Sequence, residues 1–190
     1  WNSSGQDGSD TGIYGQRYNA AGVAQGSEFR VNTYTNGDQL NPSVGMDADG
    51  DFVVTWQSRD QDGNGNGIYG QRYNASGVAQ DSEFRVNTHT TSFQVSASVA
   101  MDADGDFVAA WQSYSQDGSL YGIYGQRYNT SGVAQGSEFR VNTYTTGNQE
   151  RSAVAIDTDG DFVITWGSNG QDGDDLGIYS KQYQANGRTK

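Results

Sequence analysis

Short runs in which apolar and polar residues alternate recur along this chain, separated by stretches rich in Gly, Asn and Asp. The clearest run covers residues 52–57, where Phe52, Val54 and Trp56 fall on one side of an extended backbone. Alternation with a period of two residues is typical of a β-strand. Three further runs in the same part of the chain alternate in this way: residues 43–46, 68–73 and 83–88. Their connections carry the Asp, Asn and Gly of tight turns, so the pattern predicts four short antiparallel strands and no helix.

The whole pattern repeats along the chain. The tryptophans mark a period of 55 residues: Trp1, Trp56, Trp111 and Trp166. The runs Gly-Ile-Tyr-Gly-Gln-Arg-Tyr-Asn and Asp-x-Asp-Gly-Asp-Phe-Val recur at the same spacing. We interpret the chain, residues 1–190, as a single repeat array with units 1–55, 56–110 and 111–165 and a partial unit 166–190.

Each unit has about the size of one β-propeller blade. A four-stranded antiparallel sheet has open edges and needs neighbours to cover it, and radial packing of blades is one solution. The predicted fold is all-β, with tandem four-stranded antiparallel repeats packed as β-propeller blades; the alternative is a linear stack of small sheets or a solenoid. Because Trp1 falls inside a second strand and the chain stops after a third, we expect it to begin inside a larger array or after processing.

Composition narrows the classes of function. With a net charge of -12 and only 11 Lys and Arg, the chain lacks the basic patches that nucleic-acid binding needs. The absence of Cys excludes disulfides and thiolate metal sites, and no apolar run is long enough for a membrane span. Tyr and Trp, 12 and 4 in number, can supply a thin aromatic core. The single histidine, His89, stands where other units have Tyr, so we expect a half-exposed strand residue.

One acidic cluster per unit is a candidate metal site. In Asp-x-Asp-Gly-Asp three carboxylates stand on alternate residues, and Ca²⁺ takes six to eight oxygen ligands. The same residues suit a hairpin turn, and the run lacks the bidentate Glu of an EF-hand. Both interpretations stay open, and any Ca²⁺ site is expected to be weak, with a dissociation constant of about 10⁻⁴–10⁻³ M. The nine candidate ligands are Asp47, Asp49, Asp51, Asp102, Asp104, Asp106, Asp157, Asp159 and Asp161.

The Gln-Asp-Gly loop before each third strand is a candidate ligand-binding site. Its Asp could cap a turn, bind calcium or contact a sugar, and we expect the Tyr that follows to be exposed, where its ring could stack on a sugar. The candidate residues are Asp62, Tyr69, Asp117 and Tyr124. The tryptophans are expected in the core. Recurring arginines such as Arg72 are expected to pair with recurring glutamates such as Glu83.

The sequence does not favour catalysis. It contains no Ser/His/Asp set, no glycine-rich phosphate cradle and no zinc signature. Its acidic pairs repeat identically from unit to unit, whereas a catalytic pair needs two different environments to separate the pKa values of its members. We therefore predict that the chain is not an enzyme.

Three runs taken together resemble repeats in very large secreted bacterial proteins: Asp-x-Asp-Gly-Asp-Phe-Val-x-x-Trp, Gly-Ile-Tyr-Gly-Gln-Arg-Tyr-Asn and Glu-Phe-Arg-Val-Asn-Thr. The resemblance covers the whole chain. Those proteins often also carry hemolysin-type calcium-binding repeats or cadherin-like modules. The resemblance implies an extracellular, cell-surface or adhesin-like setting with calcium dependence.

These observations predict an extracellular structural or adhesive repeat module of a bacterial surface protein. The alternative is a multivalent carbohydrate-binding lectin with one weak site per repeat. The expected partners are glycans, other parts of a longer chain, or further copies in a homo-oligomer or filament. Copies would join head to tail, with the strand at residues 27–33 of one copy completing the last sheet of another as its fourth strand.

Overall fold

The computed structural model describes residues 1–190 and consists of strands, turns and loops. Its fourteen strands form four antiparallel sheets that follow one another in chain order. The first sheet contains β1 (Asn2–Ser4), β2 (Thr11–Tyr18) and β3 (Ala24–Arg30); the second β4 (Gln39–Met46), β5 (Phe52–Arg59), β6 (Asn66–Tyr73) and β7 (Ala79–Arg85); the third β8 (Gln94–Met101), β9 (Phe107–Tyr114), β10 (Tyr121–Tyr128) and β11 (Phe139–Arg140); the fourth β12 (Gln149–Ile156), β13 (Phe162–Asn169) and β14 (Leu176–Tyr183). The chain contains no helix that is long and apolar enough to cross a membrane.

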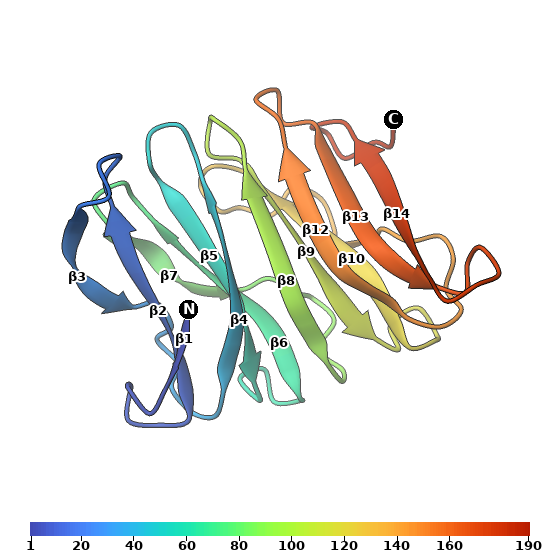
Figure 1. Ribbon diagram of the computed structural model, residues 1–190, viewed down its shortest axis with the longest axis horizontal. Helices are drawn as coiled ribbons and strands as arrows, with labels where there is room; N and C mark the ends of the chain where they lie inside the picture. Colours follow the sequence, from blue (N-terminus) through green and yellow to red (C-terminus); the bar gives the residue numbers. More distant parts are fainter.

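The sheets are arranged as propeller blades in an open row. The first strands of neighbouring sheets, β4, β8 and β12, lie beside one another, and each sheet runs outward from there in the order first, second, third and fourth strand. Figure 1 places the first and last sheets at opposite ends of the row. The predicted all-β fold of blade-like repeats is confirmed. Two complete four-stranded sheets lie between two three-stranded ones, as the repeat boundaries indicate.

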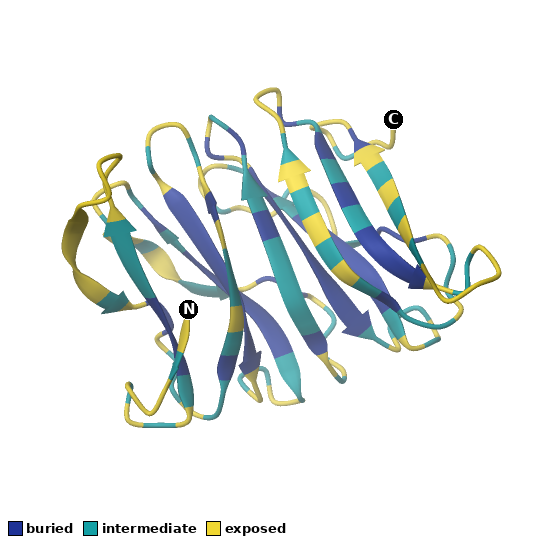
Figure 2. Ribbon diagram, in the orientation of Figure 1, coloured by how far each residue is buried: buried dark blue, intermediate teal, exposed yellow.

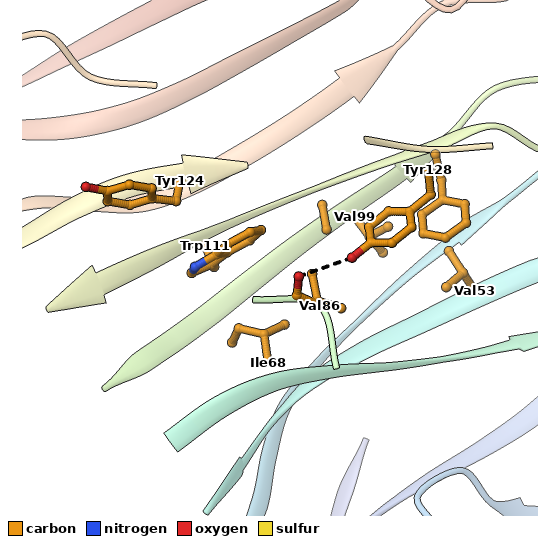
Figure 3. Close-up of a cluster of buried hydrophobic side chains, with 9 residues drawn as sticks. Val53, Ile68, Val86, Val99, Trp111, Tyr124 and Tyr128 are labelled. Carbon is orange, nitrogen blue, oxygen red and sulfur yellow. Dashed lines mark hydrogen bonds between the residues drawn. The ribbon is translucent and has the colours of Figure 1, made fainter. Parts of the chain in front are cut away.

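The core is divided into three packets, one between each pair of neighbouring sheets. One face of a sheet supplies Val and Ile, and the facing sheet supplies Phe, Tyr and Trp. Between the second and third sheets, Val53 and Ile68 pack against Phe107, Trp111 and Tyr128 (Figure 3). The packets on either side contain the equivalent residues. The predicted core position of the tryptophans is confirmed for Trp56, Trp111 and Trp166, which are 0%, 0% and 6% exposed.

Each of the four strands of the second sheet differs from the sequence pattern at one boundary or both, and two of these differences have a clear physical reason. The first strand begins at Gln39 rather than residue 43, because a bulge between Leu40 and Ser43 adds a residue and interrupts the alternation. At this bulge Asn41 adopts a left-handed conformation with φ 54°. The fourth strand ends at Arg85 rather than residue 88, since Val86 is already part of the buried connection to the next sheet. His89 is half-buried as expected, but it lies in this connection and not in a strand.

Candidate functional site at the open ends of the array

In the acidic hairpin turns, most of the carboxylates accept hydrogen bonds from backbone amides. Asp47 Oδ1 accepts hydrogen bonds from the amides of Asp49 and Asp51, over 3.0 and 2.9 Å. Asp51 Oδ1 accepts one from the amide of Ala75 in the next turn of the same sheet, over 2.7 Å. The pattern is identical in the third and fourth sheets. These contacts support the hairpin-turn interpretation of the run.

The middle aspartates of these turns, Asp49, Asp104 and Asp159, are exposed. Nowhere in residues 1–190 do three His, Cys, Asp or Glu side chains converge in an arrangement that could hold a metal ion. The geometry therefore adds no support for calcium, and calcium binding stays a prediction. Asp102 differs from its counterparts: it is only 8% exposed, and its burial raises its pKa, against the lowering effect of hydrogen bonds from the amides of Asp106 and Asp104.

The Gln-Asp-Gly loops bring the predicted Asp and Tyr together, with the Asp half-buried and the Tyr buried. Asp62 Oδ1 caps its turn by accepting a hydrogen bond from the amide of Asn64, over 3.2 Å, and Oδ2 is buried beside Gly67 without a hydrogen-bond partner. Tyr69 is 7% exposed. Burial first, and then the neighbouring Asp62 carboxylate, raise the pKa of Tyr69 to about 12.

The expectation that these tyrosines are exposed is wrong. Tyr124 is 6% exposed, and its pKa is also raised to about 12, first by burial and then by Asp117. Asp117 Oδ2 accepts a hydrogen bond from Asn142 Nδ2 over 3.3 Å. The physical reason lies in the sheet register: Tyr69 stands directly opposite Trp56 on the neighbouring strand, so both rings face the same core packet. The two aspartate–tyrosine pairs offer no open surface for a sugar ring.

The recurring arginines form clasps between neighbouring sheets. Arg72 in the second sheet donates hydrogen bonds to the carbonyl oxygens of Ser131 and Thr130 in the third, over 2.8 and 2.7 Å. Arg17 and Arg127 reach the equivalent turns through the carbonyl oxygens of Ala75 and Ala185. The expected Arg–Glu pairing is therefore wrong. A guanidinium with several donors suits a turn that presents two free carbonyls better than a single carboxylate.

The recurring glutamates instead fasten each fourth strand to the connection that enters its own sheet. Glu83 Oε2 accepts hydrogen bonds from the amide and the hydroxyl of Thr33, over 2.7 and 2.9 Å. Glu138 accepts the same pair from Thr88, over 2.6 and 2.9 Å. Glu28, in the first sheet, accepts a hydrogen bond only from Gln6. The connection that enters the fourth sheet has Thr143 at the equivalent position, and that sheet has no fourth strand to supply a glutamate.

The first sheet leaves exposed two rings that are buried everywhere else in the array. Tyr18 is 64% exposed, whereas Tyr73, Tyr128 and Tyr183 are 5%, 5% and 3% exposed. Trp1 is 51% exposed. In the other three sheets the tyrosine stacks on the phenylalanine of the second strand, with ring centroids 4.9, 4.7 and 4.7 Å apart. The first sheet has no such phenylalanine, because β1 covers only the beginning of β2.

A groove runs along this uncovered part of β2. Its volume is about 610 Å³, and it lies between the first and second sheets. Trp1, Tyr18 and Phe29 line one side, and Phe52 and Val54 line the other. In the second sheet the equivalent strand positions, Gly70 to Tyr73, pair with Thr55 to Phe52. The groove is therefore the place that a second strand fills in the other sheets.

The last sheet departs from the repeat on its free strand, β14. The face toward the third sheet is preserved, with Phe162, Ile164 and Trp166 in the core packet. On β14, Gln182 replaces the clasp arginine and Ser180 replaces a glycine. Ile178 is 77% exposed, whereas the equivalent Ile13, Ile68 and Ile123 are fully buried. Figure 2 shows β14 in the exposed and intermediate colours over most of its length.

The groove and the exposed face of β14 could be anticipated only in part from the sequence. The incomplete units at both ends are visible in the register of the repeat. The same register shows that Tyr18 has no Phe partner. That this exposes the Tyr18 ring can be inferred only once the stacking of Phe52 on Tyr73 is known.

Comparison with known proteins supports the fold. No family model matches the chain, and no curated protein matches it in sequence. Among solved structures, an α-L-arabinofuranosidase from Lactobacillus brevis is similar with a TM-score of 0.52 and 9% identity, over 94% of this chain and 71% of that one. An endo-arabinase from Bacteroides thetaiotaomicron gives a TM-score of 0.48 and 15% identity over 75% of this chain. The chain spans about half, 55%, of the length of that arabinase. At these identities the likeness concerns the fold alone.

Proposed function

We propose that the chain is an extracellular structural repeat module that assembles head to tail with further copies. The observation that carries the proposal is the contrast between the interior and the ends of the array. Residues that are buried in all three internal packets have exposed equivalents only at the two ends, with Tyr18 64% and Ile178 77% exposed. Burying one such side chain contributes about 1.5–3 kcal/mol.

The repeated residues support a scaffold more than a ligand site. What recurs from sheet to sheet is packing: the Phe–Tyr stack of the last three sheets, the arginine clasp of the first three, and the Asp caps of the turns. The candidate sugar-stacking rings Tyr69 and Tyr124 are buried in that packing. Residues that differ between units lie in the exposed loops, such as Asp174 and Asp175, and also in the first strands β4, β8 and β12.

Sedimentation velocity over a concentration series tests the proposal. We expect the average mass to rise with concentration, and Tyr18→Asp to hold the chain as a monomer because it places a charge on the open face of the first sheet. Val78→Asp is the matched control, since Val78 is also an exposed apolar residue, 57% exposed, but lies away from both ends. A wild-type chain that stays monomeric at every concentration would refute assembly.

Glycan binding is the second candidate, and the groove beside Tyr18 favours it. The groove combines aromatic rings with polar groups of Gln16, Asn19 and Gln25, a combination that suits a sugar. The protein of similar fold is named as an arabinofuranosidase, an enzyme that acts on carbohydrate, which is consistent with this candidate. It predicts one site per chain rather than one per repeat. A glycan array answers the question: binding to one sugar class, lost in Tyr18→Ala and kept in Tyr69→Phe, would favour the lectin.

A further inference from the structure

We propose that the third sheet binds an uncharged sugar ring at the end where β9 turns into β10. Four residues form this site: Phe93, Tyr114, Leu120 and Tyr121. They belong to an interior sheet, which has the second sheet on one side and the fourth on the other. The site is therefore separate from the groove beside Tyr18 and independent of the proposed assembly.

This end of the third sheet is apolar where the other units are mostly polar. In the second sheet the equivalents of Phe93 and Tyr114 form an ion pair, with Asp38 Oδ2 4.0 Å from Arg59 Nη1. The equivalents of Leu120 are Asp10, Gly65 and Asp175, and those of Tyr121 are Thr11, Asn66 and Leu176. Phe93 is 46% exposed and Leu120 is 43% exposed. Apolar side chains that gather on a surface mark an interaction site.

The conformation of the loop between β9 and β10 does not require these apolar residues. The amide of Ser115 donates a hydrogen bond to the carbonyl oxygen of Leu120 over 2.7 Å and closes the loop. The same bond closes the loops of the second and fourth sheets, over 2.5 and 2.7 Å, where a glycine and an aspartate stand in place of the leucine. Because polar residues build a loop with the same closure, the apolar residues of the third sheet serve a purpose other than the fold.

Tyr114 and Tyr121 form an aromatic corner. They stand directly opposite each other on β9 and β10, with ring centroids 5.1 Å apart and ring planes at 69°. In such an edge-to-face pair, the ring that contributes its edge keeps both of its faces free of the partner. Both residues are half-buried, and their hydroxyls have no hydrogen-bond partner within the chain. The corner offers a ring face to the C–H groups of a sugar and two hydroxyls to its polar edge.

Phe93 extends the site toward the second sheet. Its carbonyl oxygen accepts a hydrogen bond from the amide of Tyr114 over 2.9 Å, which places it next to the corner at the start of β8. A Cβ added to Gly65, in the loop of the second sheet, would lie 3.2 Å from Phe93 Cδ1. The site therefore spans the third sheet from the corner to the neighbouring loop.

The loop of the third sheet presents almost no charge. Asp117 is the only charged residue in it, and both of its carboxylate oxygens accept hydrogen bonds, Oδ1 from the Ser119 amide over 3.2 Å and Oδ2 from Asn142 Nδ2 over 3.3 Å. A cationic ligand would favour the equivalent loop of the fourth sheet, which has three aspartates. An anionic ligand would meet the field of a chain whose net charge is -12. The ligand that fits this surface is uncharged.

The size of the site favours a sugar over a protein partner. Aromatic side chains have about 150–250 Å² of surface each, so the exposed parts of these four residues add up to on the order of 300 Å². A stable protein–protein interface buries about 800 Å² on each partner. An area of this size matches one or two sugar rings, and the second candidate function thereby gains a specific place in the interior of the array.

A variant that copies the second sheet tests the site. Phe93→Asp/Tyr114→Arg replaces both rings by the residues that the second sheet already carries there, so we expect a melting temperature close to that of the wild type. An array of neutral oligosaccharides of glucose, xylose, mannose and galactose, with their uronic-acid counterparts, identifies the probe, and calorimetric titration measures its affinity. We expect binding of a neutral sugar, with a dissociation constant that rises about 10-fold or more in the double variant because the buried aromatic area is lost.

Tyr18→Ala is the matched control, since it removes an exposed ring elsewhere on the chain and should leave the affinity unchanged. A wild-type chain that binds no neutral sugar, or equal dissociation constants for the wild type and the double variant, would overturn the site. A double variant that loses self-association in sedimentation velocity, from a wild type that binds no sugar, would make this surface a contact between copies and would also overturn it. Sugar binding and self-association are measured separately, so the failure of one leaves the other standing.

Discussion

The hydroxyl of Tyr73 in the second sheet donates a hydrogen bond to the carbonyl oxygen of Val31, beside the first sheet, over 3.2 Å. Tyr128 makes the same bond to Val86 in the next interface, over 3.1 Å (Figure 3). Because the bond links a third strand to the connection of the preceding unit, it fixes how far one blade is displaced from the next. This hydroxyl therefore fixes the register of the first two interfaces, whereas in the third the Tyr183 hydroxyl is buried without a hydrogen-bond partner.

Removal of this hydroxyl should weaken the interface by a measurable amount. We expect Tyr73→Phe to lower the free energy of unfolding by about 1 kcal/mol, since the buried Val31 carbonyl loses a donor. Tyr18→Phe should change it little, because Tyr18 is exposed. Urea denaturation of the two variants makes the comparison. An equal loss in both would show that the bond does not contribute.

The buried tyrosines predict a sharp loss of stability at alkaline pH. Burial raises the pKa of Tyr69, Tyr73, Tyr124 and Tyr183 to about 12, while a phenol in the unfolded chain titrates near its ordinary value. Stability is therefore fully present below about pH 10 and falls as pH rises through 12, because the unfolded state then binds fewer protons. A shift of about two pKa units sets an upper bound of about 3 kcal/mol for the contribution of each tyrosine. Far-ultraviolet circular dichroism from pH 8 to pH 12.5 should show one cooperative transition above pH 10, and an unchanged spectrum at pH 12.5 would contradict it.

The glycine under the fourth-strand phenylalanine should tolerate no side chain. In Gly70→Ala the new Cβ would lie 2.8 Å from Phe84 Cζ, and such overpacking costs about 1–3 kcal/mol. Adding Phe84→Leu should recover part of the loss. Ser180→Ala is the control in the last sheet, where no such ring lies above the strand, and its melting temperature should match the wild type. A full loss that Phe84→Leu does not relieve would point to the backbone rather than to the ring.

Substitution of an aspartate by its amide distinguishes the hairpin-turn interpretation of the acidic turns from the calcium-site interpretation. Asp47→Asn keeps an Oδ1 that can accept both backbone hydrogen bonds, so we expect the melting temperature without calcium to be nearly unchanged. Asp47→Ala should cost about 1 kcal/mol. If the weak calcium sites exist, millimolar Ca²⁺ should raise the melting temperature of the wild type and raise that of Asp47→Asn less. Equal responses would remove Asp47 from the list of ligands.

The strands could be predicted because the residues on each face alternate, as Phe52, Val54 and Trp56 do. The bulge at Asn41 breaks the alternation, and the pattern of apolar and polar residues therefore predicts the first strand too short. The division into blade-like sheets follows from the period of 55 residues, which places the same strands and turns in each unit.

The candidate site was harder to predict. Tyr69 follows a polar loop, which suggested exposure, but its cross-strand partner Trp56 draws it into the core, and strand register is a property of the folded sheet. Charge alone predicts a pair between Arg72 and Glu83. The carbonyl partners of Arg72, Ser131 and Thr130, lie in the next unit, and backbone acceptors leave no mark in a sequence.

The most direct test of head-to-tail joining is a cross-link between two single-cysteine variants. Within the second sheet the end of the second strand lies opposite the beginning of the third, where Arg59 faces Asn66, and Asn169 and Thr11 hold these two positions in the last and first sheets. Because the chain has no cysteine, Asn169→Cys and Thr11→Cys can be mixed and oxidised without side reactions. We predict a disulfide-linked dimer that contains one of each variant, and none when Thr11→Cys is mixed with Ala134→Cys. A mixture that yields no mixed dimer, or equal amounts of all pairings, would contradict the joint.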